Sequence, residues 1–435
     1  MDGGTRKRVV IVGGGQAGGR LAHALARSDR VSTILLCGEP RPPYERPPLS
    51  KGVLLGTRGF DSCLMWPKGD PAWERVDLRT GVAAAAIDRQ ARTVRLEDGV
   101  VLGYDHLVIA TGSRLRQLTV PGSGLANVHS LRSYDQALAI ARDFAPGKRL
   151  VVVGGGFIGL EIAASARLRN LETTVVEASD RLLARVVPSR IASLLARRHE
   201  DEGVTLRKGA MVERFISNGR GAVRAVELST GEILPCDLAV VGVGVAANVE
   251  LAAAAGLEVE VGIRVDRHLR TSDPAISAIG DVAAFWHPLY ERHVRVEAWQ
   301  NAEDHARVLA AVLAGEDASA DSVPYFWSDQ YDLSLQIGGL PHLGSSMVTR
   351  TRSDGAAILF HLEPDGRLVG ATGLGTGGSI GRDIRLTQLL IARRARPDRA
   401  MLRDPSVRLK ALLDHDALAP HPPAAVSAEP LPGGA

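Results

Sequence analysis

Two short segments share the glycine spacing that binds the pyrophosphate of a dinucleotide. They are Gly13-Gly14-Gly15-Gln16-Ala17-Gly18 and Gly154-Gly155-Gly156-Phe157-Ile158-Gly159. In this pattern the first glycine makes a tight turn, the second lets the backbone approach the phosphates, and the third allows a helix to pack closely on a strand. The N–H groups at the start of the helix then bind the phosphates. One such segment alone is also typical of a structural turn, but two in series predict two dinucleotide sites.

Each glycine pattern is followed by an acidic residue at the end of the next predicted strand. These residues are Glu39 and Glu177, and both are expected to accept hydrogen bonds from adenosine ribose hydroxyls. A carboxylate at Glu177 accepts a 2′-hydroxyl and repels a 2′-phosphate, so it favours NADH over NADPH. Arg181 and Arg185 follow closely and either could reach a phosphate, which weakens this preference; Arg185 is counted among the predicted nucleotide contacts.

A third motif indicates which nucleotide each site binds. The segment from Thr271 to Gly280-Asp281 looks like the flavoprotein signature whose final Asp hydrogen-bonds the ribityl chain of FAD, and Ala110-Thr111-Gly112 resembles the matching turn. A plain helix N-cap is the alternative reading of Asp281. If the outer segments bind FAD, the glycine pattern between them must bind the nicotinamide nucleotide.

The elements that must position these residues form two βαβ units. The first has strands at 8–12 and 32–37, and the second has strands at 149–153 and 173–176 with a helix through 161–168. Further strands are expected within 81–101, 106–110, 234–243 and 262–283, and short strands and turns from 323 onward. Consecutive βαβ units predict parallel sheets that bind ligands at the strand C-termini.

The expected fold class is therefore α/β, with two Rossmann-like dinucleotide-binding domains and a C-terminal α+β domain. The NAD-binding domain is inserted in the FAD-binding domain. The expected boundaries are 1–120 and 245–322 for the FAD domain, 121–244 for the NAD domain, 323–413 for the C-terminal domain, and 414–435 for a disordered tail.

Composition excludes several other classes of protein. The formal charge is +3, and no block of basic residues suggests a nucleic-acid surface, although a mildly positive surface suits a small acidic protein partner. Cys37, Cys63 and Cys236 are isolated, so no metal site and no disulfide framework is expected. No apolar stretch approaches the ~20 residues of a membrane span. The start of the chain does not look like a signal peptide, so the expected location is the cytoplasm.

From about Arg8 to about Leu413 the chain resembles the ferredoxin reductases of bacterial oxygenase systems, which have a glutathione-reductase-like fold. The motifs that carry this resemblance are Tyr44-Glu45-Arg46-Pro47-Pro48-Leu49-Ser50-Lys51, Gly159-Leu160-Glu161, Val296-Glu297-Ala298-Trp299-Gln300-Asn301-Ala302 and Tyr325-Phe326-Trp327-Ser328-Asp329-Gln330. The resemblance implies FAD and NADH as cofactors and a [2Fe–2S] ferredoxin (or a rubredoxin) as electron acceptor. It also implies that the ferredoxin supplies a Rieske dioxygenase of aromatic hydrocarbon catabolism, or a cytochrome P450.

Lys51 stands where related flavoproteins carry a redox-active cysteine. Leu49-Ser50 is followed by Lys51, and the nearest cysteine in the sequence is Cys63. Without a thiol, the electrons must pass directly from the flavin to an external acceptor. The resemblance places Lys51 near flavin N5 and pairs it with Glu161, and it makes Lys51, Glu161 and Trp327 the expected catalytic residues.

The resemblance also implies contacts for the two cofactors. Trp299 would lie against the flavin ring, and Trp327 between the flavin and the docked iron–sulfur protein, although a core position is the alternative for each tryptophan. Further expected cofactor contacts are Ala17, Arg46, Ala84, Arg132 and Gly244, with Ala84 acting through its backbone. Relatives often have a proline before the asparagine of Ala246-Ala247-Asn248, which leaves that loop open. Histidines 287, 293 and 305 receive no role.

Two other functions are compatible with the same motifs. A reductase of this fold could pass electrons to rubredoxin, a quinone or monodehydroascorbate. A flavoprotein like apoptosis-inducing factor binds NADH and changes its assembly instead of turning over. No targeting presequence and no long basic insertion is recognised in the sequence, which argues against the second alternative.

Overall fold

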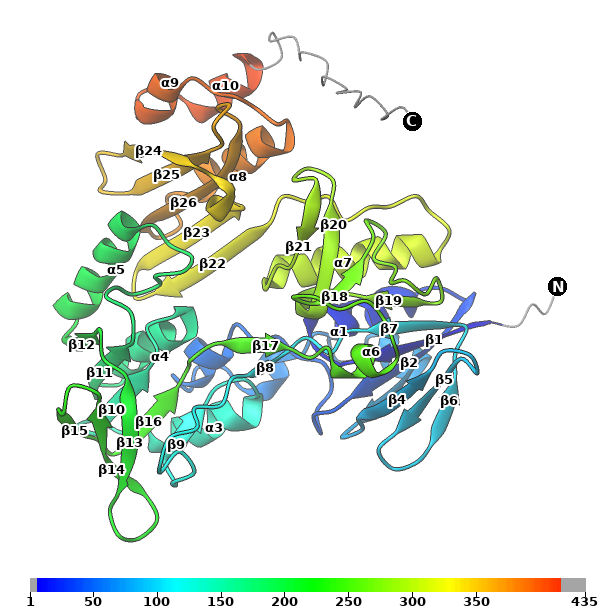
Figure 1. Ribbon diagram of the computed structural model, residues 1–435, viewed down its shortest axis with the longest axis horizontal. Helices are drawn as coiled ribbons and strands as arrows, with labels where there is room; N and C mark the ends of the chain where they lie inside the picture. The colour runs from blue at the N-terminus through cyan, green and yellow to red at the C-terminus, as the bar shows by residue number, and fades with distance from the viewer. Residues whose placement is uncertain (1–5, 416–435) are drawn as a thin grey trace, which may run out of the picture.

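The computed structural model describes residues 6–415, and three five-stranded sheets organise this part of the chain (Figure 1). The first sheet has the order β19-β7-β1-β2-β3, and its paired strands are all parallel. Its strands are β1 (Lys7–Val12), β2 (Val31–Cys37), β3 (Val76–Thr80), β7 (His106–Ile109) and β19 (Ile276–Ala278). Because β19 comes from far downstream, two distant segments of the chain build this sheet together.

The second sheet is formed entirely by strands that lie between β7 and β19 in the sequence. Its order is β12-β11-β10-β16-β9, and it is also parallel. The strands are β9 (Val128–Ser130), β10 (Arg149–Val153), β11 (Glu172–Glu177), β12 (Val204–Lys208) and β16 (Leu238–Val241). Helices α3 (Tyr134–Asp143), α4 (Phe157–Leu168) and α5 (Ser189–Asp201) belong to the same part of the chain. The α/β fold class with an inserted second unit is therefore confirmed.

Both parallel sheets have strands that are buried on two faces. Residues 9–11 of β1 and 107–109 of β7 are fully buried, and they form an unbroken apolar run in each of these two neighbouring strands. Helix α1 (Gln16–Leu25) connects β1 to β2, and α7 (Trp299–Leu313) packs against α1. Packing on both faces removes the strands of a parallel sheet from water, which explains why these strands do not alternate apolar and polar residues.

The C-terminal sheet is antiparallel and has longer strands than the sequence suggests. Its order is β22-β23-β26-β25-β24, with β22 (Tyr325–Gln330), β23 (Leu333–Gly339), β24 (Ser346–Thr351), β25 (Ala357–Leu362) and β26 (Leu368–Thr376). The glycines of β26 suggest turns, yet a Cβ on Gly373 would approach Ile380 Cδ1 to 2.9 Å. Glycine therefore allows α8 (Gly381–Ala392) and the residue before it to pack on the strand, so these glycines mark close packing and not loops.

The remaining described elements are short. They are α2 (Ala72–Arg75), α6 (Glu250–Ala254), α9 (Arg399–Arg403), α10 (Leu409–His415), β4 (Ala84–Asp88), β5 (Thr93–Leu96), β6 (Val101–Gly103), β8 (Ser113–Leu115), β13 (Val212–Ser217), β14 (Val223–Leu228), β15 (Ile233–Pro235), β17 (Val245–Ala247), β18 (Ile263–Val265), β20 (Ala283–His287), β21 (Arg292–Val294), a π-helix η1 (Leu49–Val53), and the 3-10 helices η2 (Phe60–Cys63), η3 (Gly280–Val282) and η4 (Pro341–Leu343). The tail expected at 414–435 lies outside the described residues except for its first two residues, which end α10.

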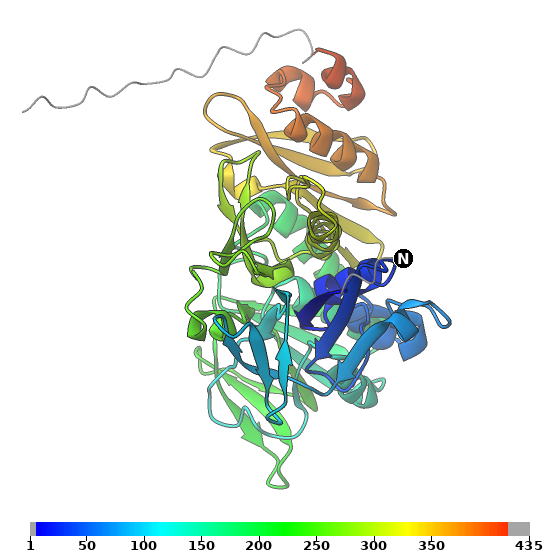
Figure 2. The ribbon, with the colours of Figure 1, turned by 90° about the vertical axis from the view of Figure 1, so that its right-hand side faces the viewer.

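The three sheets occupy three lobes of the molecule. In Figure 1 the first sheet lies on the right, the second at the lower left and the C-terminal sheet at the upper left, and the pair β8–β17 runs between the first two. Figure 2 shows the C-terminal helices α8 to α10 at the end of the molecule farthest from β13 and β14. The predicted C-terminal α+β domain is thus present. Within residues 6–415, no helix combines the length and the apolar character that crossing a bilayer needs.

Candidate functional site

The first glycine pattern has the geometry of a phosphate-binding turn. Gly13 has a φ of +118°, and a Cβ there would lie 2.2 Å from the carbonyl oxygen of Ala110. A Cβ on Gly18 would lie 1.9 Å from the Gly13 oxygen, whereas a Cβ on Gly15 would meet nothing within 4 Å. Gly13 and Gly18 are therefore required by the fold, but Gly15 borders open space at the N-terminus of α1, where a phosphate fits.

The second glycine pattern repeats this geometry at the N-terminus of α4. Gly154 has a φ of +110°, and a Cβ there would lie 2.4 Å from the Gly242 oxygen. A Cβ on Gly159 would lie 2.1 Å from the Gly154 oxygen, and one on Gly156 would again meet nothing within 4 Å. The same division of tasks in two turns fits two dinucleotides bound by one chain.

A cavity of about 940 Å³ opens at the C-terminal ends of the first sheet. It brings together many of the predicted site residues, namely Gly13, Gly15, Gln16, Ala17, Glu39, Arg46, Lys51, Ala110, Thr111, Gly112, Arg132, Phe157, Ile158, Glu161, Gly280, Asp281, Trp299 and Trp327. The predicted residues that do not line it are Gly18, Ala84, Gly154, Gly156, Gly159, Glu177, Arg185 and Gly244. Most of these belong to the second glycine turn or its surroundings, and Ala84 begins β4.

Charged side chains line the cavity next to the first glycine turn. The Arg46 guanidinium lies 2.6 Å from a Glu39 carboxylate oxygen and also donates to the Arg132 carbonyl. The Arg132 guanidinium lies 3.8 Å from the Asp281 carboxylate, and burial lowers its pKa from the ordinary value. A half-buried arginine with so distant a counter-ion fits a phosphate group, which would supply the missing negative charge.

Asp281 and Glu39 are both held by neutral hydroxyl groups. Ser113 Oγ donates to Asp281 Oδ2 at 2.9 Å, so the Asp281 carboxylate keeps one oxygen for a ligand. Tyr44 donates from its hydroxyl to Glu39 at 2.5 Å and accepts from the Tyr134 backbone N–H at 3.0 Å. Burial raises the pKa of Tyr44 to about 12, so its hydroxyl keeps its proton near neutral pH and can donate.

Lys51 and Glu161 form an ion pair at the floor of the cavity. Lys51 Nζ lies 2.6 Å from Glu161 Oε2, and the Glu161 side chain is only 5% exposed. Ser50 Oγ donates to Glu161 Oε2 at 2.5 Å, and Ser328 Oγ donates to Oε1 at 2.7 Å. Three donors from two segments, η1 and β22, therefore converge on one buried carboxylate, which offsets its desolvation. The sequence motifs contain Ser50 and Ser328, but adjacency in the chain does not reveal that both contact Glu161.

The backbone that carries Lys51 is a π-helix. The Val53 N–H donates to the Pro48 carbonyl at 3.0 Å, which is the wide hydrogen bond of this helix type. Pro47 and Pro48 precede the turn, and η1 packs against α4. A π-helical turn widens the local spacing of side chains and is frequent at functional sites. Here it directs Ser50 and Lys51 to the same carboxylate although they are adjacent in sequence.

Aromatic side chains from three segments close the cavity. The Trp299 and Trp327 rings meet edge to face at 5.8 Å, and Tyr325 stacks on Trp327 at 6.0 Å. Phe157, the first residue of α4, contacts Phe326 at 4.4 Å. Trp299 Nε1 is buried and has no hydrogen-bond partner among residues 6–415. An unpaired indole N–H at the edge of a cavity fits a polar acceptor atom on a bound ring.

Cysteine chemistry does not contribute to this site. All three cysteines of the chain lie among the described residues and are free and buried. Cys37 lines the cavity, but burial raises the pKa of its thiol to about 12, so it is neither a thiolate nor part of a dithiol pair. The three cysteines therefore offer no thiol relay at this cavity.

The two arginines that follow Glu177, Arg181 and Arg185, have different surroundings. Arg181 donates to the carbonyls of Ala184 at 2.5 Å and Val187 at 2.7 Å, so its charge serves the local backbone. Arg185 is exposed, and its guanidinium would lie 3.7 Å from a Cβ on Gly244. Glu177 itself accepts from the Gly155 N–H at 2.7 Å and the Ser179 N–H at 2.8 Å. Its charge thus lies directly beside the second glycine turn.

The loop that lacks the expected proline nevertheless closes one side of the cavity, which Ala246 and Asn248 line. Ala246 and Ala247 belong to β17, and the Asn248 side chain donates to the Thr111 carbonyl at 2.8 Å. The Asn248 N–H donates to the Gly112 carbonyl at 2.9 Å, and the Thr111 hydroxyl donates to the Asn248 carbonyl at 2.8 Å. Asn248 therefore joins the loop after β17 to the turn at Thr111 and Gly112 without a preceding proline.

Sequence reasoning missed His305. Its Nδ1 accepts a hydrogen bond from the Gly280 N–H at 3.1 Å, and this contact supports the turn that carries Asp281. Burial lowers the pKa of His305 to about 3, so its ring is neutral and able to accept. His305 follows Ala302 on α7 by three residues, and this spacing next to a motif residue is the sequence signal that could have identified it.

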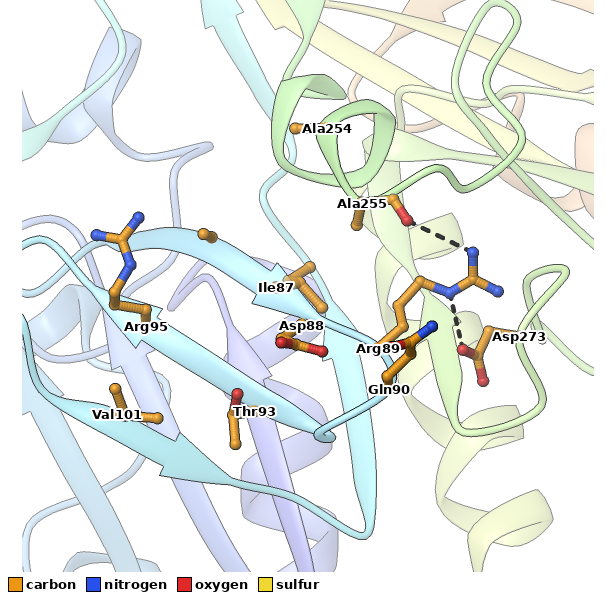
Figure 3. A pocket seen from close by; sticks show the side chains of 11 residues that line it. Ile87, Asp88, Arg89, Gln90, Thr93, Arg95, Val101, Ala254, Ala255 and Asp273 are labelled. Atoms are coloured by element: carbon orange, nitrogen blue, oxygen red, sulfur yellow. Dashed lines mark hydrogen bonds and ion pairs between the residues drawn. The ribbon is translucent and has the colours of Figure 1, made fainter.

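A second hollow lies apart from these groups. It has a volume of about 840 Å³ and is formed by β4, β5 and β6 together with the end of α6 (Figure 3). Arg89 donates to Asp273 at 2.9 Å and to the Ala255 carbonyl at 3.4 Å, as Figure 3 shows. Because its central arginine is already paired, we assign no chemistry to this hollow.

Comparison with known proteins agrees with this geometry. Residues 7–306 match the family model described as pyridine nucleotide-disulphide oxidoreductase, and residues 325–413 match the one described as reductase C-terminal. The chain is 42% identical to the ferredoxin–NAD+ reductase component of an anthranilate 1,2-dioxygenase system from Burkholderia cepacia, over 93% of this chain and 98% of that relative. It is 40% identical to putidaredoxin reductase from Pseudomonas putida, over 76% of this chain and 80% of that one.

One solved structure is similar over almost its whole length. The crystal structure of the covalent putidaredoxin reductase–putidaredoxin complex matches with a TM-score of 0.90 and 35% identity, covering 95% of this chain and 99% of that chain. The similarity extends through all three sheets, because only a small part of either chain is left outside the superposition.

Proposed function

We propose a function from one premise: this chain belongs to the pyridine nucleotide-disulphide oxidoreductase family. It is an FAD-dependent ferredoxin–NAD+ reductase, which takes electrons from NADH and passes them to a [2Fe–2S] ferredoxin. That ferredoxin in turn supplies an oxygenase, either a Rieske dioxygenase or a cytochrome P450. The single observation that carries this proposal is the Lys51–Glu161 ion pair at 2.6 Å, on a chain whose three cysteines are all free and buried.

We assign the two glycine turns to different cofactors. In this proposal residues 1–120 and 245–322 bind FAD, residues 121–244 bind NADH, and residues 323–413 face the ferredoxin. The strand order supports the assignment, because β19 returns to the sheet that begins with β1. Gly15, Arg132 and Asp281 would hold the pyrophosphate and ribityl groups of FAD, and Gly156 and Glu177 the pyrophosphate and ribose of NADH.

FAD, when bound, accepts an electron pair from the nicotinamide and releases it one electron at a time, as a [2Fe–2S] acceptor requires. The protein supplies position and charge for this exchange. Lys51 would place a positive charge beside the flavin ring, and Glu161 would keep the ammonium group oriented. Trp299 and Trp327 would exclude water from the ring and lead toward the docked ferredoxin, because their rings lie 5.8 Å apart at the cavity edge.

The cellular location belongs to the same proposal. We place the protein in the cytoplasm, where NADH is available. Buried free thiols at Cys37, Cys63 and Cys236 suit a reducing compartment.

Reduction of cytochrome c by the purified holoenzyme tests this function. NADH-driven reduction should require an added [2Fe–2S] ferredoxin, since the ferredoxin accepts each electron and passes it to cytochrome c. A panel with rubredoxin, a quinone and monodehydroascorbate in place of ferredoxin serves as the comparison. Equal rates with one of these acceptors, or a long-lived complex with NADH and negligible turnover, would contradict the proposal.

A further inference from the structure

One face of strand β22 meets helices α4 and α5 at every second residue. Phe326 contacts Phe157, Ser328 donates to Glu161, and the Gln330 side chain lies next to His199 of α5. Alternate residues of a strand share a face, so Trp327 projects to the opposite side, where it meets Trp299. The contacts that bind β22 to the helices therefore also set the position of Trp327.

The hydrogen bonds on this face continue beyond Ser328. Gln330 Nε2 donates to Ser328 Oγ at 3.1 Å, and His199 Nε2 lies 2.8 Å from Gln330 Oε1. The Tyr331 hydroxyl lies 3.2 Å from His199 Nδ1. Ser328, Gln330 and His199 are each at most 1% exposed. The result is a buried chain of contacts from Tyr331 to Glu161 and its partner Lys51.

When His199 is neutral, the donors and acceptors in this chain can be oriented in only one consistent way. The Glu161 carboxylate only accepts, so the Ser328 O–H donates to it and Ser328 Oγ accepts from the Gln330 amide. Gln330 Oε1 then accepts from His199 Nε2–H, which leaves His199 Nδ1 to accept from the Tyr331 hydroxyl. This order requires a neutral His199, and burial lowers the pKa of that ring from its ordinary value.

We propose that His199 is a positioning residue for the reduction of the flavin, acting through Gln330 and Ser328 on the Glu161–Lys51 pair. The inference rests on the function proposed above and deepens it. The chain does not carry protons from end to end, because the Gln330 amide connects His199 and Ser328 through two different atoms. Its role is to select one orientation of each group that supports Glu161.

The role of His199 follows from the shape of the Gln330 amide, because its oxygen and its nitrogen occupy nearly the same space when the group turns over. Without the His199 donor, the Gln330 side chain is free to turn over and present its oxygen to Ser328. The Ser328 proton would then be shared between Gln330 and Glu161, and Glu161 would lose one of its three donors. Lys51 would become less well oriented although no residue that contacts it has changed.

The experiment measures stopped-flow reduction of the FAD holoenzyme by NADH. His199→Leu should slow flavin reduction about tenfold with little change in the concentration of NADH that half-saturates the rate, since the change acts on orientation and not on nucleotide binding. His199→Gln retains an N–H donor near the position of Nε2 and should recover the rate to within about twofold. His129→Leu is the matched control, because His129 belongs to the same sheet unit but binds Asp143 at 2.9 Å.

A double-variant cycle separates this role from a loss of structure. In a Lys51→Ala background, His199→Leu should cause no further slowing, because its effect passes through Lys51. Gln330→Leu gives a second entry to the same cycle if His199→Leu retains too little FAD. Native rates in both His199→Leu and Gln330→Leu, or equal slowing with and without Lys51, would overturn the inference. Failure of the wild-type holoenzyme to be reduced by NADH would instead overturn the proposed function.

Discussion

Glu161 is the residue through which most of the site is organised. Its carboxylate receives the ammonium group of Lys51 and two serine hydroxyls, one from η1 and one from β22. Burying an ion pair costs desolvation energy that good geometry and additional hydrogen bonds must offset. The convergence of donors on Glu161 therefore indicates that the position of Lys51 is tightly controlled, as its proposed role beside the flavin requires.

Lys51→Ala should slow reduction of the flavin by NADH roughly ten- to a hundredfold, because a fixed charge beside the reacting ring is lost. FAD should remain bound, since Lys51 is one of many groups that line the cavity. The measurement is stopped-flow absorbance of the bound flavin. Lys68→Ala is the control, because Lys68 is an exposed lysine paired with Asp61. Hydride transfer at the native rate in Lys51→Ala would remove Lys51 from the mechanism.

Glu177→Gln should reduce the discrimination between NADH and NADPH. The amide oxygen can still accept from the Gly155 or Ser179 N–H, so the glycine turn is retained while the negative charge is lost. The ratio of kcat/KM for NADPH to kcat/KM for NADH should rise about tenfold. The repulsion between residue 177 and the 2′-phosphate is relieved, and the exposed Arg185 can contact that phosphate. Unchanged discrimination would mean that another group reads the ribose, and Arg185→Ala in the same background tests that possibility.

At the scale of single elements, the two glycine turns use chemically identical residues for different purposes. Gly154 is needed because any Cβ would collide with the Gly242 oxygen, but Gly156 borders open space. The conformation at Gly156 has a φ of −82°, which alanine also adopts. The two positions therefore separate folding from nucleotide binding within one turn.

Gly156→Ala should keep the fold and the FAD, and raise the half-saturating NADH concentration about tenfold, because a methyl group occupies space that the pyrophosphate needs. Gly154→Ala should instead lower the thermal stability, through collision with the backbone and strain at positive φ. The measurements are flavin reduction against NADH concentration and a thermal unfolding curve. Loss of stability in Gly156→Ala at native NADH affinity would contradict the assignment.

At the scale of the whole molecule, a buried histidine couples stability to pH. The pKa of His305 falls from 6.5 to about 3 in the folded protein. As the pH falls below 6.5, the unfolded chain binds a proton that the folded chain does not, so the free energy of unfolding decreases. The contribution is fully present above pH 6.5 and declines by about 1.4 kcal/mol per pH unit until the folded pKa is reached.

His305→Gln should therefore show a smaller loss of stability between pH 7.5 and pH 5 than the wild-type protein, by about 2 kcal/mol. Glutamine can still offer an acceptor to the Gly280 N–H, so the turn at Asp281 is retained. Chemical unfolding, followed by release of FAD fluorescence, gives the free energy at each pH. His293→Gln, at a half-buried histidine, is the control. Parallel pH curves for His305→Gln and the wild-type protein would disprove this role.

The sequence by itself determined the parts of this protein that local rules govern. Gly13, Gly15 and Gly18 and their second copy specify a turn between a strand and a helix, and the apolar runs specify buried parallel strands. The resemblance of the motifs around Lys51 and Trp299 to a known family led to the correct function class. It also implied the ion pair of Lys51 with Glu161, which is present at 2.6 Å.

Only the tertiary structure decided which distant groups share one site. Glu161 meets Ser50 and Ser328 across sequence separations of 111 and 167 residues, and His305 meets Gly280 because α7 packs against η3. The glycines of β26 mark close packing of α8, although in sequence they suggest turns. Such contacts depend on how whole elements pack, and side chains at single positions carry no local signal of the partner they will meet.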